Sequence, residues 1–130
     1  MGSYFKQIEV TPSLMMGKRF PIMLEAVKNE AKDSRWEHYG WRERMLAAPT
    51  FTHAMRIMGM TPIYEGDDIF TVDVDGMYDS VFFWPMLKRI APYMNPGRIV
   101  VRVENVIEEY RFQDGDVYYS AKKLKSDEDE

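Results

Sequence analysis

Apolar and polar side chains alternate most regularly between residues 97 and 120, with the period of two that marks a strand with one buried face. Glu104-Asn105 interrupts the alternation, and Asn tolerates the left-handed backbone that a tight turn requires. Asp114-Gly115 is the strongest hairpin signal in the chain, because both central residues of a type I′ turn need positive φ. The stretch therefore predicts a three-stranded antiparallel meander, which needs a helical cover because isolated hairpins are marginal in water.

Upstream of this stretch, the apolar positions take the spacing of amphipathic helices. Residues 20–32 follow the i, i+3, i+4, i+7 template, which predicts a first helix over this range. Ser34 and Glu37 match a capping box, so a second helix is predicted to begin there and to end at Pro49.

Two further helices are predicted, one short and one affected by a proline. The short helix lies between Thr50, its N-cap, and Gly59, the residue that follows its end. The last helix is predicted to begin near Trp84 after an irregular turn, because Pro85 inside a longer helix would cost a backbone hydrogen bond.

Weaker strand signals lie before the first helix and after the third. Residues 4–10 have strand-like content and predict an edge strand, and residues 13–17 are expected to form a loop with two exposed methionines. Residues 61–65 and 69–74 predict a hairpin around a Gly-Asp-Asp turn, in which Phe70 shares a face with the two valines that follow it.

This order of elements (strand, three helices, hairpin, helix, three strands) predicts an α+β fold. We expect a two-layer domain in which helices pack on one face of a largely antiparallel sheet, with five or six strands in that single sheet. Residues 1–120 are assigned to one domain. Residues 121–130, a basic run followed by an acidic run, are expected to form a disordered tail.

Composition narrows the class of protein. The chain of 130 residues is 45% hydrophobic, which is enough to bury a core, and it has no cysteine for a disulfide, a thiolate nucleophile or a metal ligand. The amino terminus has no signal-peptide pattern, and no apolar run reaches the length of a membrane span. We expect a cytoplasmic protein without a membrane partner.

The formal charge of -4 is concentrated at the carboxyl end, where residues 127–130 are all acidic. The remaining chain is neutral in total. A strong field for phosphate groups is therefore not expected, and nucleic acid is not the predicted partner.

Carboxylates gather around the predicted hairpin of residues 61–74. Six lie within fifteen residues: Glu65, Asp67, Asp68, Asp73, Asp75 and Asp79. Residues 73–76 resemble a fragment of a calcium loop, but the other ligand positions and the terminal glutamate are not at the required spacing, so we predict no metal site. We expect the first five of these carboxylates to contact a basic surface of another protein.

Methionine and aromatic residues are abundant, with 11 Met, 8 Tyr, 7 Phe and 3 Trp. Some of them are difficult to place in the predicted core: Met15, Met16, Trp36, Trp41, Met77 and Tyr78. Such residues are enriched at adaptable contact surfaces, so the last four are predicted to bind a partner or a second copy of the chain. The alternative is a core that is larger than the pattern indicates.

Histidine suits acid–base chemistry near neutral pH, and the chain has His38 and His53. No catalytic or metal-binding motif accompanies them, so we predict no catalytic residue and no cofactor. Four arginines lie among aromatic residues of the second and third helices: Arg35, Arg42, Arg44 and Arg56. Such residues can bind nucleic acid, but the interleaved glutamates favour a mixed, solvated face.

The carboxyl-terminal segment resembles a pattern in small uncharacterised α+β proteins of bacteria and their phages. The residues concerned are Ile90-Ala91-Pro92-Tyr93, Gly97-Arg98-Ile99, Glu109-Tyr110-Arg111-Phe112 and Asp114-Gly115. In those proteins a helix that ends in Ala-Pro-Tyr leads into a hairpin whose second strand carries aromatic and Arg residues before an Asp-Gly turn. The resemblance implies the fold of the C-terminal half and an origin in a mobile element, and it implies no catalytic residues.

We therefore expect a non-enzymatic module that binds another protein. The resemblance implies that it is a phage or mobile-element accessory protein, such as an inhibitor of a host protein complex. Two alternatives stay open. One is a small-molecule-binding domain or small enzyme that uses His38 or His53 beside a carboxylate. The other is a structural homo-oligomer.

Overall fold

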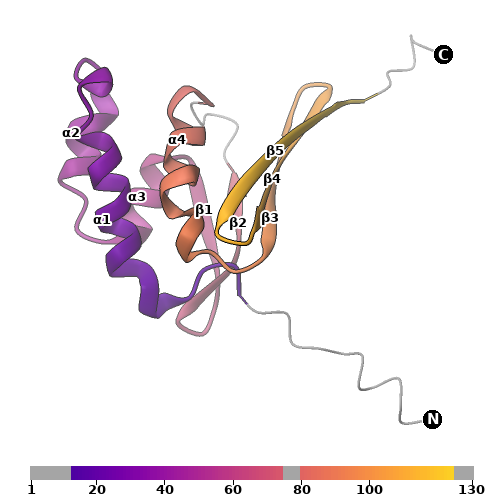
Figure 1. Cartoon of the computed structure of the whole chain (residues 1–130), viewed down its shortest axis with the longest axis horizontal. Helices are drawn as coiled ribbons and strands as arrows, with labels where there is room; N and C mark the ends of the chain where they lie inside the picture. Colours follow the sequence, from indigo (N-terminus) through magenta and orange to yellow (C-terminus); the bar gives the residue numbers. More distant parts are fainter. Residues whose placement is uncertain (1–12, 75–79, 125–130) are drawn as a thin grey trace.

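The structure is a computed structural model that describes residues 13–74 and 80–124. Within these residues the helices are α1 (Phe20–Ala31), α2 (Gly40–Leu46), α3 (Phe51–Ile57) and α4 (Ser80–Ile90), and the strands are β1 (Met60–Glu65), β2 (Asp68–Val74), β3 (Gly97–Val103), β4 (Val106–Gln113) and β5 (Asp116–Lys123). Figure 1 shows α1, α2 and α3 on one side of the molecule and β3, β4 and β5 on the other, with α4 between them. The predicted α+β class is confirmed.

The described strands form two antiparallel sheets rather than the single sheet that we expected. β1 pairs with β2, and β3, β4 and β5 pair in that order. An N-terminal segment occupies the second edge of β2: Leu14 donates its N–H to the carbonyl of Phe70 (3.3 Å), and Met15 and Ile69 exchange two backbone hydrogen bonds of 3.0 and 2.8 Å. This segment therefore occupies the edge of β2 at Ile69 and Phe70.

The same segment contacts the turn before β3. Asn95 donates its backbone N–H to the carbonyl of Leu14 (3.0 Å) and its side-chain amide to that of Ser13 (2.6 Å). The expected exposure of both methionines is wrong, because Met15 is fully buried and Met16 is half-buried. Residues 13–15 therefore join the β1–β2 hairpin to the chain that leads into β3.

The predicted hairpin of β1 and β2 is confirmed, but its second strand contains an extra residue. Ile63 pairs with Thr71 and Tyr64 pairs with Ile69, which leaves Phe70 outside the register. Phe70 is exposed and Ile69 is buried. The expected alternation, which placed Phe70 on the same face as the later valines, is wrong because a bulge shifts the side chains that precede it to the other face.

The first and third predicted helices are confirmed as α1 and α3. Thr50 caps α3, since its hydroxyl accepts the backbone N–H of His53 (3.1 Å). Gly59 follows α3 with a φ of 85°, the left-handed conformation that ends many helices.

The second predicted helix is wrong in its start. The side chain of Asp33, not of Ser34, accepts the backbone N–H two residues further on (3.0 Å), and a short 3-10 turn follows instead of an α-helix. α2 begins only at Gly40. The bend between the two brings Trp36 and Trp41 into contact, with 5.4 Å between ring centroids, which a continuous helix would not do at this spacing.

α4 begins at Ser80 and contains Pro85, so the expected start near Trp84 is wrong. An internal proline costs about 3 kcal/mol, because it removes a backbone hydrogen bond and crowds the preceding turn. Burial of each large apolar side chain contributes about 1.5–3 kcal/mol, which is why the helix tolerates the proline. The buried side chains of α4 include Phe82, Phe83, Met86, Leu87 and Ile90.

The meander of β3, β4 and β5 is confirmed, including its Asp-Gly turn. Asp114 and Gly115 both have positive φ, 55° and 77°, and in the preceding turn Glu104 has a φ of 54°. β5 continues to Lys123, so the expected disordered tail at residues 121–130 is wrong for its first three residues.

One face of the meander is buried under α4, and the other is exposed (Figure 1). The buried residues of this inner face are Ile99, Val101, Tyr110, Phe112 and Val117. The predicted packing of helices on one face is therefore confirmed.

Some predictions lie outside the described residues: the edge strand at residues 4–10, and Asp75, Met77, Tyr78 and Asp79. Among the residues that the structure does describe, no helix combines the length and apolarity that a membrane span requires.

Candidate functional site

The two predicted partner-binding tryptophans belong to the core. Trp36 and Trp41 are 4% and 6% exposed, so the prediction that they form a surface is wrong and the larger core is correct for them. Trp41 stacks on Phe82 of α4, with ring centroids 4.4 Å apart. The indole N–H of Trp36 donates to the carboxylate of Glu30 (2.8 Å).

Glu30 is a buried carboxylate that the sequence pattern did not single out. Its side chain is 3% exposed and also accepts from Arg35 (2.6 Å) and Arg89 (2.9 Å). Burial alone would raise the pKa of Glu30, but the hydrogen bonds from Trp36 and Arg89 and the charges of both arginines outweigh burial and lower the pKa. This carboxylate joins α1, the 3-10 turn and α4, and its role is structural.

The acidic hairpin is partly used inside the molecule. Asp68 accepts the backbone N–H of Gly17 (2.7 Å), while Glu65, Asp67 and Asp73 are exposed. Among the described residues, no group of three or more His, Cys, Asp or Glu side chains is placed to hold a metal ion.

The other candidate side chains are dispersed over the surface. His38 and His53 are both exposed, on the turn before α2 and in the first turn of α3. Arg35 pairs with Glu30, and Arg42 donates to the carbonyl of Ala31 (2.7 Å). These contacts anchor both arginines to α1.

A pocket of about 310 Å³ opens between α4 and the middle of β4 and β5, lined by Trp84, Glu108, Tyr110 and Tyr119. The strands place three of these side chains together: Glu108 and Tyr110 lie two residues apart on one face of β4, and Tyr119 of β5 is the direct cross-strand partner of Tyr110. α4 contributes Trp84 from the opposite side.

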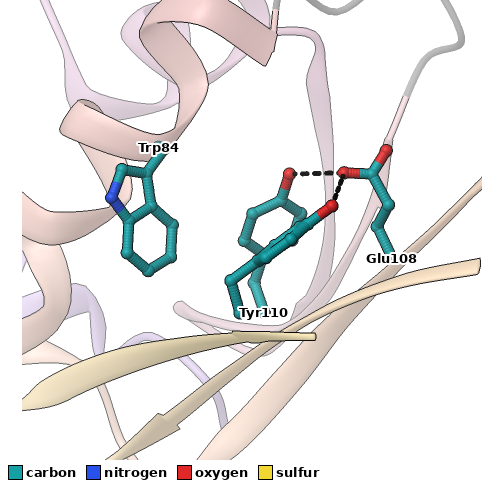
Figure 2. A pocket seen from close by; sticks show the side chains of 4 residues that line it. Trp84, Glu108 and Tyr110 are labelled. Carbon is teal, nitrogen blue, oxygen red and sulfur yellow. Dashed lines mark hydrogen bonds between the residues drawn. The ribbon is translucent and has the colours of Figure 1, made fainter. Parts of the chain in front are cut away.

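The pocket is formed by three aromatic rings and one carboxylate (Figure 2). The ring centroid of Trp84 lies 6.2 Å from those of Tyr110 and Tyr119, and the two tyrosine rings are 5.3 Å apart. Both tyrosine hydroxyls donate to the same carboxylate oxygen of Glu108, at 3.2 Å from Tyr110 and 2.9 Å from Tyr119. Tyr110 is 3% exposed and Tyr119 is 49% exposed, so one ring forms the floor and the other the rim.

Desolvation and the carboxylate of Glu108 make the phenol of Tyr119 hold its proton more strongly than an ordinary phenol does. Desolvation, then the hydrogen bond to Glu108 and the charge of Glu108, raise the pKa of Tyr119. The phenol therefore stays protonated at neutral pH and serves as a donor. The ammonium of Lys88 lies 5.6 Å from the ring centroid of Trp84 and pairs with Asp116 at 2.9 Å.

Sequence reasoning missed this pocket, although two signals for it were present. The alternation in β4 places Glu108 on the buried face with Tyr110, and a carboxylate on a buried face requires a partner. The two-residue turn at Asp114-Gly115 fixes the register that aligns Tyr110 with Tyr119.

Comparison of this chain with protein-family models, with curated proteins and with solved structures gives no match. The resemblance of the carboxyl-terminal segment to proteins of bacteria and phages stays a prediction.

Proposed function

We propose that this chain is a non-enzymatic binding module that holds an alkylated ammonium group of a partner protein in the pocket between α4 and the meander. The observation that carries the proposal is the set of three aromatic side chains and one carboxylate around an open volume of about 310 Å³. This volume suits the end of one side chain rather than a folded surface. The proposal keeps the protein partner that we expected from the sequence and assigns it a different contact site.

The chemistry of the lining selects for a cation with little hydration. Aromatic faces attract cations through the ring quadrupole, and each contact is worth about 0.5–1 kcal/mol at an exposed site and about 2 kcal/mol when water is excluded. Glu108 adds a formal negative charge, and the two tyrosine hydroxyls hold its carboxylate in place. Methyl groups on the nitrogen reduce its hydration and pack against the rings, so a methylated lysine is preferred to an unmodified one.

The decisive experiment compares ligands that differ only in charge. By calorimetry, a peptide with trimethyllysine is expected to bind more tightly than the same peptide with unmodified lysine. An isosteric side chain in which carbon replaces the nitrogen is expected to bind far more weakly. Equal binding of this neutral analogue would refute the cation site. Free choline is a further ligand for the same titration. If choline binds more tightly than the trimethyllysine peptide, the site is assigned to a small ligand.

Two adjacent tyrosines on opposite faces of β5 give a matched pair of variants. Tyr119→Leu removes a ring of the pocket, while Tyr118→Leu removes an exposed ring from the other face. The first change is expected to weaken peptide binding about tenfold. The second is expected to leave it unchanged, and an equal loss in both variants would contradict the assignment.

The biological setting of this module rests on the resemblance alone. An accessory protein of a phage or mobile element, acting on a host protein complex, fits a small domain that binds one modified side chain. Capture from a host lysate with the Tyr119→Leu variant as the control should recover a partner that the variant does not retain, and recovery of the same proteins by both would argue against this setting.

A second candidate, self-association, is favoured by exposed apolar side chains on the β1–β2 hairpin. Ile63, Tyr64 and Phe70 are 42%, 49% and 42% exposed. Scattered exposed apolar residues are normal, but three on one hairpin form a candidate contact between copies. Light scattering over a concentration series tests self-association. The candidate is excluded if the mass stays constant with concentration and is the same in the Phe70→Ser variant.

A further inference from the structure

The outer face of the meander, turned away from α4, carries aligned rows of basic side chains. We call it the outer sheet face and define it by Arg98, Val100, Arg102, Ile107, Glu109, Arg111, Tyr118, Ser120 and Lys122. The strand register places Arg98, Arg111 and Tyr118 in one row. It places Arg102, Ile107 and Lys122 in another row.

This face is positively charged although the body of the chain is neutral. It has four basic residues and one acidic residue, Glu109, which is paired with Arg98 at 2.9 Å. Asp116, which the alternation of β5 also assigns to this side, is paired with Lys88 of α4 at 2.9 Å. The guanidinium of Arg102 makes a long contact of 3.4 Å to the backbone carbonyl of Glu104, and both Arg102 and Lys122 are exposed. Every second residue of each strand faces outward, so the fold gathers on one face basic residues that are interleaved with other residues in the sequence.

The outer sheet face also has a flat aromatic group beside a shallow hollow. Tyr118 is 46% exposed, and the guanidinium of Arg111 lies 5.4 Å from its ring centroid. A hollow of about 230 Å³ lies against this pair, with Ser120 and Glu109 on its other sides. Planar guanidinium and phenol groups that are open to solvent on a sheet are suited to stacking with nucleic-acid bases.

We propose that the outer sheet face binds single-stranded nucleic acid. One base stacks on the Arg111–Tyr118 pair, and Arg102 and Lys122 contact phosphates of the same strand. An acidic protein surface would match the positive charge equally well, but the stacked guanidinium and phenol planes of Arg111 and Tyr118 match a flat base better than a carboxylate. The ammonium pocket lies on the opposite face of the same sheet, so this proposal does not depend on the proposed function.

The experiment measures the fluorescence anisotropy of a labelled single strand of about ten nucleotides, a length within the usual site size of small single-strand binders. Oligothymidine and oligouridine are each titrated between about 50 and 200 mM salt. Phosphate contacts from Arg102 and Lys122 predict a slope of log K against log salt of about −1.4. The Arg102→Gln/Lys122→Gln double variant is expected to reduce the slope by about 1.4.

Two single variants separate charge from stacking. Tyr118→Leu is expected to weaken binding about tenfold with little change in the salt slope, whereas Tyr64→Leu, which removes an exposed ring of β1, is the aromatic control and should have no effect. Arg44→Gln, on α2, is the charge control and should also have little effect. All these side chains are exposed, so urea midpoints should match the wild type.

Three results would overturn the proposal. The first is no binding at low salt. The second is an equal loss of affinity in Arg44→Gln and in the double variant, which would indicate a diffuse charge effect. The third is competition by an acidic peptide together with full binding by Tyr118→Leu, which would assign the face to an acidic protein.

Discussion

Replacing Glu30 with alanine tests which contact holds the helices together. The carboxylate of Glu30 is almost fully buried and accepts hydrogen bonds from Trp36 at 2.8 Å, Arg35 at 2.6 Å and Arg89 at 2.9 Å. The variant removes all three hydrogen bonds at once. The indole N–H of Trp36 is then left buried without its partner, while the two arginine side chains, 55% and 45% exposed, can turn to water.

The expected loss follows from these different exposures. An unsatisfied buried N–H costs about 1–3 kcal/mol. Each half-exposed ion pair contributes no more than about 1 kcal/mol, because water screens it. We expect Glu30→Ala to lower the free energy of unfolding by about 2–4 kcal/mol. Glu30→Gln keeps an acceptor for the indole, and its expected loss is about 1–2 kcal/mol.

Urea unfolding followed by circular dichroism measures both variants. At neutral pH, Glu30→Ala should shift the midpoint by about 1–2 M without a change in slope. The lowered pKa of Glu30 gives a second measurement, since its charge stabilises the fold above the ordinary value of 4.5 and this stabilisation is lost as pH falls through the lowered folded pKa. The advantage of the wild type over Glu30→Gln should therefore shrink in acid. A loss below about 1 kcal/mol for Glu30→Ala would refute the reasoning.

Three further predictions use pairs of proteins that differ in one contact. Trp36→Phe should destabilise the fold by about 1 kcal/mol more than Trp41→Phe, because the indole N–H of Trp41 has no acceptor among the described residues; urea midpoints decide this. Gly17→Ala should lower the melting temperature, because its Cβ would meet the backbone carbonyl of the β1–β2 turn. Gly40→Ala places its Cβ in open space and should raise the free energy of unfolding by about 0.5–1 kcal/mol. Because the pKa of Tyr119 is raised, its phenol supports stability fully below pH 10.0 and loses that effect as pH rises through the folded pKa; the wild type should therefore lose stability more steeply in alkali than Tyr119→Phe, and parallel curves would contradict this.

Local signals predicted the elements whose determinants are close in sequence. The meander follows from alternation and one Asp-Gly turn, and α3 follows from the Thr50 cap and Gly59. The prediction for the region after α1 was wrong because Asp33 and Ser34 can both act as an N-cap there. Which of them does so depends on where Trp36 and Trp41 pack. Asp33 takes the cap, and the resulting bend places Trp41 against Phe82, which is distant in the chain.

The remaining differences arise from contacts between distant residues. Met15 is buried where it pairs with Ile69, a residue much further along the chain, and no local pattern encodes this contact. Three of the four side chains that line the pocket could have been predicted, since turn register and alternation together align Glu108, Tyr110 and Tyr119. Only the approach of Trp84 required the packing of α4 on the sheet, because the expected helix began at that residue rather than before it.

The segment at residues 13–15 has a consequence for how the molecule assembles during synthesis. Its hydrogen-bond partners are residues 69–70 and 95, so the earliest described part of the chain reaches its native contacts only after most of the domain has been made. Contacts of such long sequence separation form slowly, because a large loop must close first. Docking of this segment is therefore a late event that joins the β1–β2 hairpin to the turn before β3.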